Sequence, residues 1–167
     1  LPSLAAQQIT EYEPLAKELG QDLGIQHFVF LGSGSRYGLA CEAMLKMKEM
    51  SLSASEAFHF LEFRHGPKSV VGPEMLVVGL VGQGAREQEA AVLAEVRTMG
   101  ARTLVLAEEK GSTPLPGDRA VYLESGLPDA LRGPLYLPVL QLMAYHRAVA
   151  KQLDPDSPRN LSTVVVL

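Results

Sequence analysis

The chain has 167 residues, of which 47% are apolar and 20% charged, the usual balance of a globular protein with one compact core. Fifteen basic and 19 acidic side chains give a net charge of −4, which excludes a nucleic-acid binder that relies on bulk positive charge. The longest apolar runs, such as residues 75–81, are too short to cross a bilayer, so neither nucleic acid nor membrane is expected as a partner.

The chain holds one cysteine, Cys41, which cannot form an intrachain disulfide and suits a reducing, cytoplasmic setting. No basic segment followed by an apolar run opens the chain, so no signal peptide is expected. Because the first residue is Leu1 rather than a methionine, we expect a processed form or a piece of a longer protein.

Helices and strands are predicted to alternate along the chain. Apolar residues at three- and four-residue spacing predict a helix over 3–19, and the β-rich run 26–31 predicts a strand, followed by a helix over 36–50. Ser53 and Glu56 have the spacing of a capping box, which favours a second helix over 55–63.

The second half of the chain continues this alternation. The predicted elements are a strand over 75–81, a helix over 85–99, strands over 103–107 and 120–123, and a last helix over 134–152 that Pro138 should bend or delay. Such alternation is typical of α/β proteins, and we expect a three-layer α/β/α sandwich with a parallel, flavodoxin-like sheet. No linker or repeat divides residues 1–167, so one domain is expected.

A glycine- and serine-rich loop, Gly32-Ser33-Gly34-Ser35, lies between the first predicted strand and its helix. Glycines let a backbone approach an anion, and the helix N-terminus offers free N–H groups, so the loop is a candidate site for a phosphorylated small molecule. The alternative is a tight strand-to-helix turn in which Ser35 is the N-cap.

Glu42, Lys46 and Glu49 follow at four- and three-residue spacing and share one stripe of the next helix. One interpretation is a solvated face of ion pairs. The other is that Glu49 is a general base in a cleft and Lys46 tunes its charge.

His65 stands in Arg64-His-Gly-Pro67, where glycine and proline end a helix and leave the imidazole on a loop. It is a candidate proton carrier, and a surface residue or a hydrogen-bonding loop residue is the alternative. No spacing of Cys, His or carboxylates suggests a metal site, and no cofactor is expected.

Four stretches resemble the sugar isomerase (SIS) family in their order and spacing, with the strongest likeness to the second SIS subdomain in the isomerase half of glucosamine-6-phosphate synthases. These stretches are Phe30-Leu-Gly-Ser-Gly-Ser35, Glu42-Ala-Met-Leu-Lys-Met-Lys-Glu49, Arg64-His-Gly-Pro67 and Pro158-Arg-Asn-Leu161. With two weaker likenesses, Leu1-Pro-Ser3 and Gln141-Leu-Met-Ala-Tyr-His146, the resemblance covers nearly the whole chain.

The resemblance implies that Glu49 moves a proton between C1 and C2 of an open-chain sugar phosphate and that His65 assists ring opening. It also implies a homodimer with a shared active site. No cofactor is implied. The substrate-binding residues expected are Ser33, Gly34, Ser35, Glu42, Lys46, Ser162 and Thr163.

The resemblance further implies one SIS domain over 1–167, with a leading helix in 1–24 and a C-terminal tail, 154–167, folded over the active site. Such a domain is expected to be the C-terminal half of a tandem SIS protein. The activity expected of the complete protein is amino-sugar phosphate or aldose–ketose chemistry, as in isomerases, deaminases, deglycases and aminotransferases.

Two departures from the family pattern favour a different function. Thr163 stands where the synthases have a lysine that is used with the open-chain sugar, and a threonine cannot form a Schiff base. The loop Gly82-Gln-Gly-Ala85 lacks the hydroxyls of the family's phosphate-binding loop. The alternative is therefore a sugar-phosphate sensor or regulatory binding module without catalysis.

Overall fold

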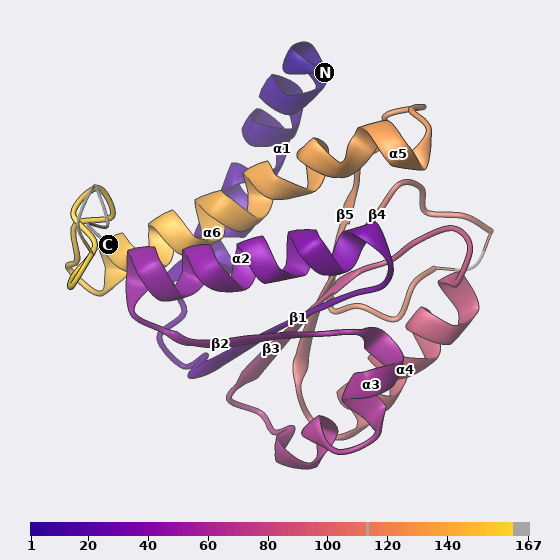
Figure 1. The fold of residues 1–167 in the computed structure, drawn as a ribbon, viewed down its shortest axis with the longest axis horizontal. Helices are drawn as coiled ribbons and strands as arrows, with labels where there is room; N and C mark the ends of the chain where they lie inside the picture. The colour runs from indigo at the N-terminus through magenta and orange to yellow at the C-terminus, as the bar shows by residue number, and fades with distance from the viewer. Residues whose placement is uncertain (113, 162–167) are drawn as a thin grey trace, which may run out of the picture.

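The computed structural model describes residues 1–112 and 114–161, which form a five-stranded parallel sheet between two layers of helices (Figure 1). The strand order is β2-β1-β3-β4-β5, with every neighbouring pair parallel. The strands are β1 (His27–Gly32), β2 (Ala54–Phe58), β3 (Met75–Leu80), β4 (Arg102–Ala107) and β5 (Arg119–Tyr122). This order confirms the flavodoxin-like sheet expected from the sequence.

The helices divide between the two faces of the sheet. They are α1 (Pro2–Gln21), α2 (Ser35–Ser51), α3 (Phe60–Arg64), α4 (Arg86–Thr98), α5 (Asp129–Arg132) and α6 (Leu137–Ala150), with short 3-10 turns η1 (Pro67–Val70) and η2 (Gly133–Tyr136). Apolar side chains of α1, α2 and α6 pack on one face, and those of α3 and α4 pack on the other. Figure 1 shows the first group above the sheet and the second below it.

The two cores follow from the alternation of side chains along the strands. In β1, Phe28 and Phe30 face α2 and α6, whereas Val29 and Leu31 face α3 and α4. Every residue of β3 is buried, as expected of a central strand that is covered on both faces.

The helix predicted over 55–63 is wrong, because residues 54–58 form strand β2 at the edge of the sheet. The predicted capping residues have other partners. Ser53 is buried and hydrogen-bonded to Ser51, and Glu56 lies 3.0 Å from Nε2 of His27 on β1. Pairing with β1 and burial of Ser55, whose hydroxyl donates to the carbonyl of Met44, outweigh the weak helix preference of Ala-Ser-Glu-Ala.

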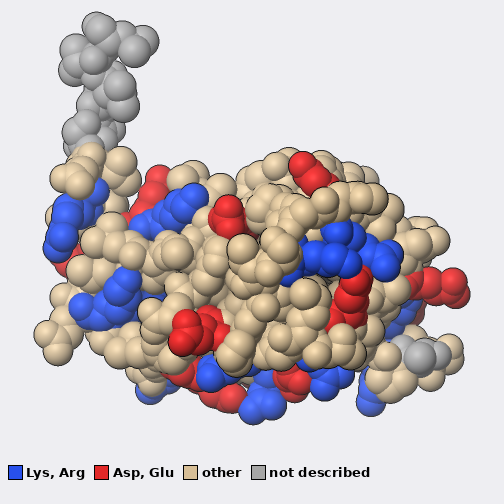
Figure 2. Space-filling model, turned by 90° about the horizontal axis from the view of Figure 1, so that it is seen from below, with Lys and Arg blue, Asp and Glu red and all other residues tan. Residues whose placement is uncertain are grey.

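The other predicted elements are found with shifted ends. Pro138 delays the last helix, as predicted: η2 covers 133–136, and α6 begins at Leu137. No helix of the described ranges has both the length and the apolar character that a bilayer crossing requires. On the face seen from below in Figure 2, basic and acidic side chains are interspersed over the described surface.

Candidate functional site

Glu49 lies in the last turn of α2 and lines a small cavity of about 170 Å³. One wall of this cavity comes from the end of α2 and the residue after it, with Met50 and Leu52 beside Glu49. The other wall is the segment that follows α6, which contributes Gln152, Leu153, Asp154, Ser157, Pro158 and Arg159. Figure 1 shows this C-terminal segment beside the end of α2. The structure therefore brings the first part of the C-terminal segment, as far as Arg159, next to the predicted proton acceptor.

The carboxylate of Glu49 is held by its own helix. Nζ of Lys46 lies 2.9 Å from Oε2 of Glu49 and 3.8 Å from Oε1 of Glu42, and the three side chains keep between 27% and 35% of their surface exposed. The hydrogen bond to Glu49 chiefly raises the pKa of Lys46, and the charge of Glu42 adds to the rise, while partial burial opposes it. The ion-pair stripe and the cavity therefore coexist: Glu49 takes part in an ordinary ion pair and also borders a hollow.

His65 does not line this cavity. It is the exposed residue at the C-terminal end of α3, and its backbone N–H donates to the carbonyl of Glu62. Helix α3 packs on the face of the sheet opposite to α2, so the fold separates His65 from Glu49 by the sheet. Any joint action of the two residues requires a second chain or a second copy.

The loop Gly32–Ser35 lies at the other end of α2 from Glu49. Fourteen residues of helix separate Ser35 from Glu49, which corresponds to about 21 Å at 1.5 Å per residue. Gly34, not Ser35, is the N-cap of α2, and no side chain caps the helix there. Ser33, Gly34 and Ser35 therefore belong to the carboxyl edge of the sheet, outside the cavity of Glu49.

At this edge, polar side chains of α2, α4 and α5 lie beside the loops that follow β1 and β3. The guanidinium of Arg36 lies directly against the backbone of Gly82, so a Cβ there would displace this side chain. It donates two hydrogen bonds, of 2.8 and 2.9 Å, to the carboxylate of Asp129. The buried carboxylate of Glu89 accepts the N–H of Gly82 at 2.7 Å. Arg36, the cation that could attract a phosphate here, is thus paired with a carboxylate, whereas Gly34 and Ser35 are exposed.

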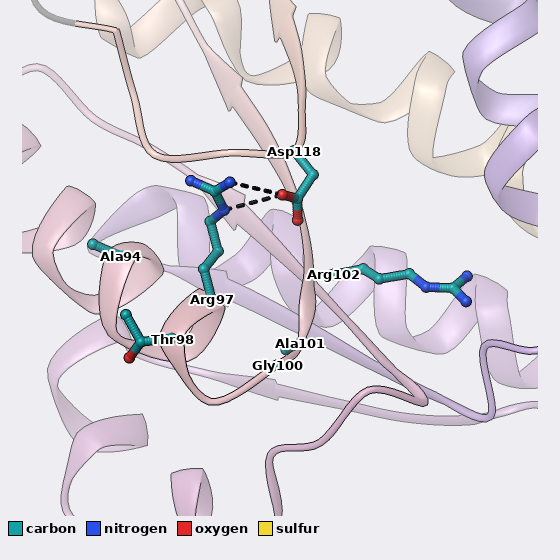
Figure 3. A pocket seen from close by; sticks show the side chains of 7 residues that line it. All are labelled: Ala94, Arg97, Thr98, Gly100, Ala101, Arg102 and Asp118. Atoms are coloured by element: carbon teal, nitrogen blue, oxygen red, sulfur yellow. Dashed lines mark hydrogen bonds and ion pairs between the residues drawn. The ribbon is translucent and has the colours of Figure 1, made fainter.

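A larger hollow, of about 650 Å³, lies at the amino edge of the sheet beside β4 (Figure 3). The charged side chains that line it are paired with other residues of the chain. Oδ1 of Asp118 accepts from Arg97, and Oδ2 accepts from the N–H and the hydroxyl of Thr103. Burial acts to raise the pKa of Asp118, but the bonds from Thr103 and the charge of Arg97 outweigh it and lower the pKa. In Figure 3, Arg102 points away from this pair. Its guanidinium is paired with Asp22. This hollow contains none of the predicted site residues.

Sequence reasoning did not identify three residues at the junction of the two cavity walls. Leu52 ends α2 in a left-handed conformation, Gln152 has φ of 58°, and Lys151 donates hydrogen bonds from α6 to the end of α2. The positive φ values leave no signature in a leucine or a glutamine, so no pattern predicted them. Ser162 and Thr163 lie outside the described residues. Within the part of the chain that the structure describes, no three His, Cys, Asp or Glu side chains form a metal-binding group.

A sequence profile of the SIS domain matches residues 25–151, from the residues just before β1 to the end of α6. The chain belongs to the SIS domain family. This SIS domain is 38% identical over 143 residues to the glutamine–fructose-6-phosphate aminotransferase of Pseudomonas putida, an alignment that covers 84% of the chain and 23% of that enzyme.

Two solved structures extend the comparison. The C-terminal domain of the glucosamine–fructose-6-phosphate aminotransferase from Francisella tularensis superposes with a TM-score of 0.80 and 28% identity, covering 92% of this SIS domain and 43% of that chain. A glucosamine-6-phosphate deaminase from Thermotoga maritima superposes with a TM-score of 0.73 and 32% identity, and the match covers 94% of this SIS domain and 46% of that chain. The chain thus spans about a quarter of the curated relatives and less than half of each of these solved chains.

Proposed function

We propose that this SIS domain supplies the proton-transfer side of a phosphosugar site, with Glu49 as the base. The observation that carries the proposal is the placement of Glu49: a carboxylate with 27% of its side chain exposed, bordering a hollow formed by α2 and the C-terminal segment. At about 170 Å³ the hollow is below the roughly 300–1,000 Å³ of sites that enclose a small ligand. It suits one end of an open-chain sugar, and the rest of the site would come from another unit.

The proposed chemistry is a proton transfer between neighbouring carbons. Glu49 takes a proton from C1 or C2 of the open-chain sugar phosphate, the carbonyl oxygen gains a proton, and an enediol or enolamine forms. The same carboxylic acid then returns the proton to the adjacent carbon, and a hydroxyl or amine proton is released in turn. One carboxylate can reach both carbons because they are bonded to each other. Lys46, 2.9 Å away, places a positive charge beside the carboxylate that accepts the proton.

His65 is proposed to assist ring opening in the site of a neighbouring subunit. Its exposed position at the end of α3, behind the sheet from Glu49, supports a role in another copy's site rather than in its own. The phosphate of the sugar is proposed to bind to a unit other than the loop Gly32–Ser35, because Arg36, the cation beside that loop, is already paired with the carboxylate of Asp129.

Hydrogen exchange with solvent tests the role of Glu49. The complete protein is incubated in D₂O with fructose 6-phosphate or glucosamine 6-phosphate, and deuterium at C1 and C2 is followed by NMR. Glu49→Gln should lower the exchange rate by roughly 100-fold or more, as expected when a general base is lost. Glu87→Gln, which removes an exposed carboxylate in the first turn of α4, is the matched control and should exchange at the unaltered rate.

The same experiment addresses the sensor alternative. A binding module without catalysis would bind the sugar phosphate, seen as a ligand-dependent rise in the melting temperature, and would leave C1 and C2 unlabelled. Exchange that proceeds equally fast in wild type and Glu49→Gln would instead remove Glu49 from the mechanism.

A further inference from the structure

Each of the two chain segments that form the walls of the Glu49 cavity turns at a non-glycine residue with positive φ. Four such residues occur within the described ranges, and two of them line this cavity: Leu52, with φ of 49° directly after α2, and Gln152, with φ of 58° after α6. For a branched side chain such as leucine this conformation is unfavourable, and it persists only where the surroundings impose it. Something must therefore hold this junction.

The ammonium of Lys151 lies at the junction. Its Nζ donates to the carbonyl of Ser51 at 2.6 Å, to the carbonyl of Leu52 at 3.0 Å and to the hydroxyl of Ser53 at 3.4 Å. An ammonium has three donors, and all three are used on three consecutive residues. The last carbonyls of a helix have no partners within the helix and carry the negative end of its dipole, so a cation there stabilises the final turn. That turn of α2 contains Glu49.

Lys151 is itself anchored by its helix. One turn earlier on α6, the buried guanidinium of Arg147 donates to the carbonyls of Asp22 and Ile25, at 2.7 and 2.5 Å, and to the hydroxyl of Ser53 at 3.4 Å. The end of α6 is thereby fixed to the connection before β1. The residue after Lys151 is Gln152, where the second cavity wall begins. Figure 1 shows the ends of α2 and α6 side by side.

We propose that Lys151 is the positioning residue for Glu49: it ties the last turn of α2 to α6 and so fixes the distance between the two walls of the cavity. This inference rests on the proposed function. A base that serves two adjacent carbons must be held closely, because a displacement of about 1 Å can reduce turnover by up to roughly 100-fold. Without the ammonium, the carbonyl of Leu52 loses this donor and the carbonyl of Ser51 keeps the long hydrogen bond from the hydroxyl of Ser53, so the left-handed turn at Leu52 is held more weakly.

The test compares three variants of the complete protein in the D₂O exchange assay. Lys151→Met keeps the length of the side chain and removes the charge. Lys151→Arg restores a cation. Lys48→Met removes an exposed lysine from the same end of α2 and is the matched control. We expect Lys151→Met to lower kcat by about 10-fold or more with KM changed less than about twofold, Lys151→Arg to recover most of the loss, and Lys48→Met to match wild type.

Amide hydrogen exchange of the ligand-free protein gives a second readout that does not depend on activity. In Lys151→Met the amides of residues 50–53 should exchange faster, while those of α4 should keep their rates. Assays are run well below the melting temperature of each variant, so that global unfolding does not contribute.

The outcomes separate the two proposals. If Glu49→Gln abolishes labelling while Lys151→Met has wild-type kcat or wild-type amide exchange at residues 50–53, the positioning role is overturned and the proposed function stands. Equal changes of kcat and KM without recovery in Lys151→Arg would also overturn it, since general loss of structure would explain them. If Glu49→Gln labels normally, the proposed function fails and the inference fails with it.

Discussion

Substituting Gly32 with alanine should destabilise the protein through a backbone contact rather than through a lost ligand site. Gly32 ends β1, and a Cβ there would lie 2.6 Å from the carbonyl carbon of Arg36 and 2.8 Å from the backbone nitrogen of Tyr37. Both atoms belong to the first turn of α2 and cannot rotate away. The carbonyl oxygen of Arg36 lies closer still, so that turn must move by about 1 Å to reach the ordinary contact distance of 3.4 Å.

Such a shift opens the packing between α2 and β1. Overpacking of this kind costs about 2–3 kcal/mol, and since about 1 kcal/mol changes the melting temperature of a chain of this size by roughly 2–4 °C, the expected loss is roughly 5–10 °C. The assay is urea denaturation followed by circular dichroism, with thermal melts alongside.

Gly38, the residue after Tyr37 in α2, is the matched control. It is exposed, and a Cβ there would meet nothing within 4 Å. Gly38→Ala should therefore raise the free energy of unfolding by about 0.5–1 kcal/mol, because alanine favours a helix over glycine. The two substitutions should therefore change the free energy of unfolding in opposite directions. If Gly32→Ala unfolds within about 0.5 kcal/mol of wild type, the packing argument is wrong.

Two further predictions concern α6. Arg147→Met should lower the free energy of unfolding by about 2–4 kcal/mol, because the carbonyls of Asp22 and Ile25 lose charged donors. The control, Arg119→Met, breaks an exposed ion pair and should change this free energy little. Both are measured by urea titration, and equal effects of the two substitutions would contradict the argument. Burial chiefly lowers the pKa of His146 below its ordinary value of 6.5. The unfolded chain then binds more protons than the folded one. The stability that is present above pH 6.5 is therefore lost as the pH falls from 6.5 through the lower pKa of the folded protein. His146→Gln should lose less stability than wild type between pH 8 and pH 5.5; an identical pH dependence would rule this out.

The strand missed in the sequence shows how tertiary context decides a short segment. Ala-Ser-Glu-Ala-Phe has no strong local preference, and the serine–glutamate spacing before it fits a helix start. Its conformation is set by the five register pairs with β1 and by the cover of α2 above Ser55. None of these contacts is visible in a window of sequence, because the partners are supplied by residues more than ten positions away.

Some features of the candidate site were likewise predicted from the sequence, and others depended on the tertiary structure. The spacing of Glu42, Lys46 and Glu49 predicted their shared stripe, since neighbours on a helix follow from its 3.6-residue turn. The sequence could not show that Asp129 would meet Arg36 across 93 positions and neutralise the cation beside Gly32–Ser35. The predicted helix over 36–50 already places the loop and Glu49 at opposite ends, but the surroundings of each end come only from the tertiary structure.

The sequence by itself determined the α/β class with its parallel sheet and the fully buried β3, because hydrophobic periodicity and the right-handed crossover constrain chain geometry locally. It did not determine the full order of the sheet, since strand β2 was predicted as a helix. Only the tertiary structure decided which polar groups meet. Lys151 reaches Ser51 across 100 positions, and Arg147 reaches Ile25 across 122. Such contacts depend on how helices are placed on the sheet, and a side chain's own sequence neighbours carry no record of that placement.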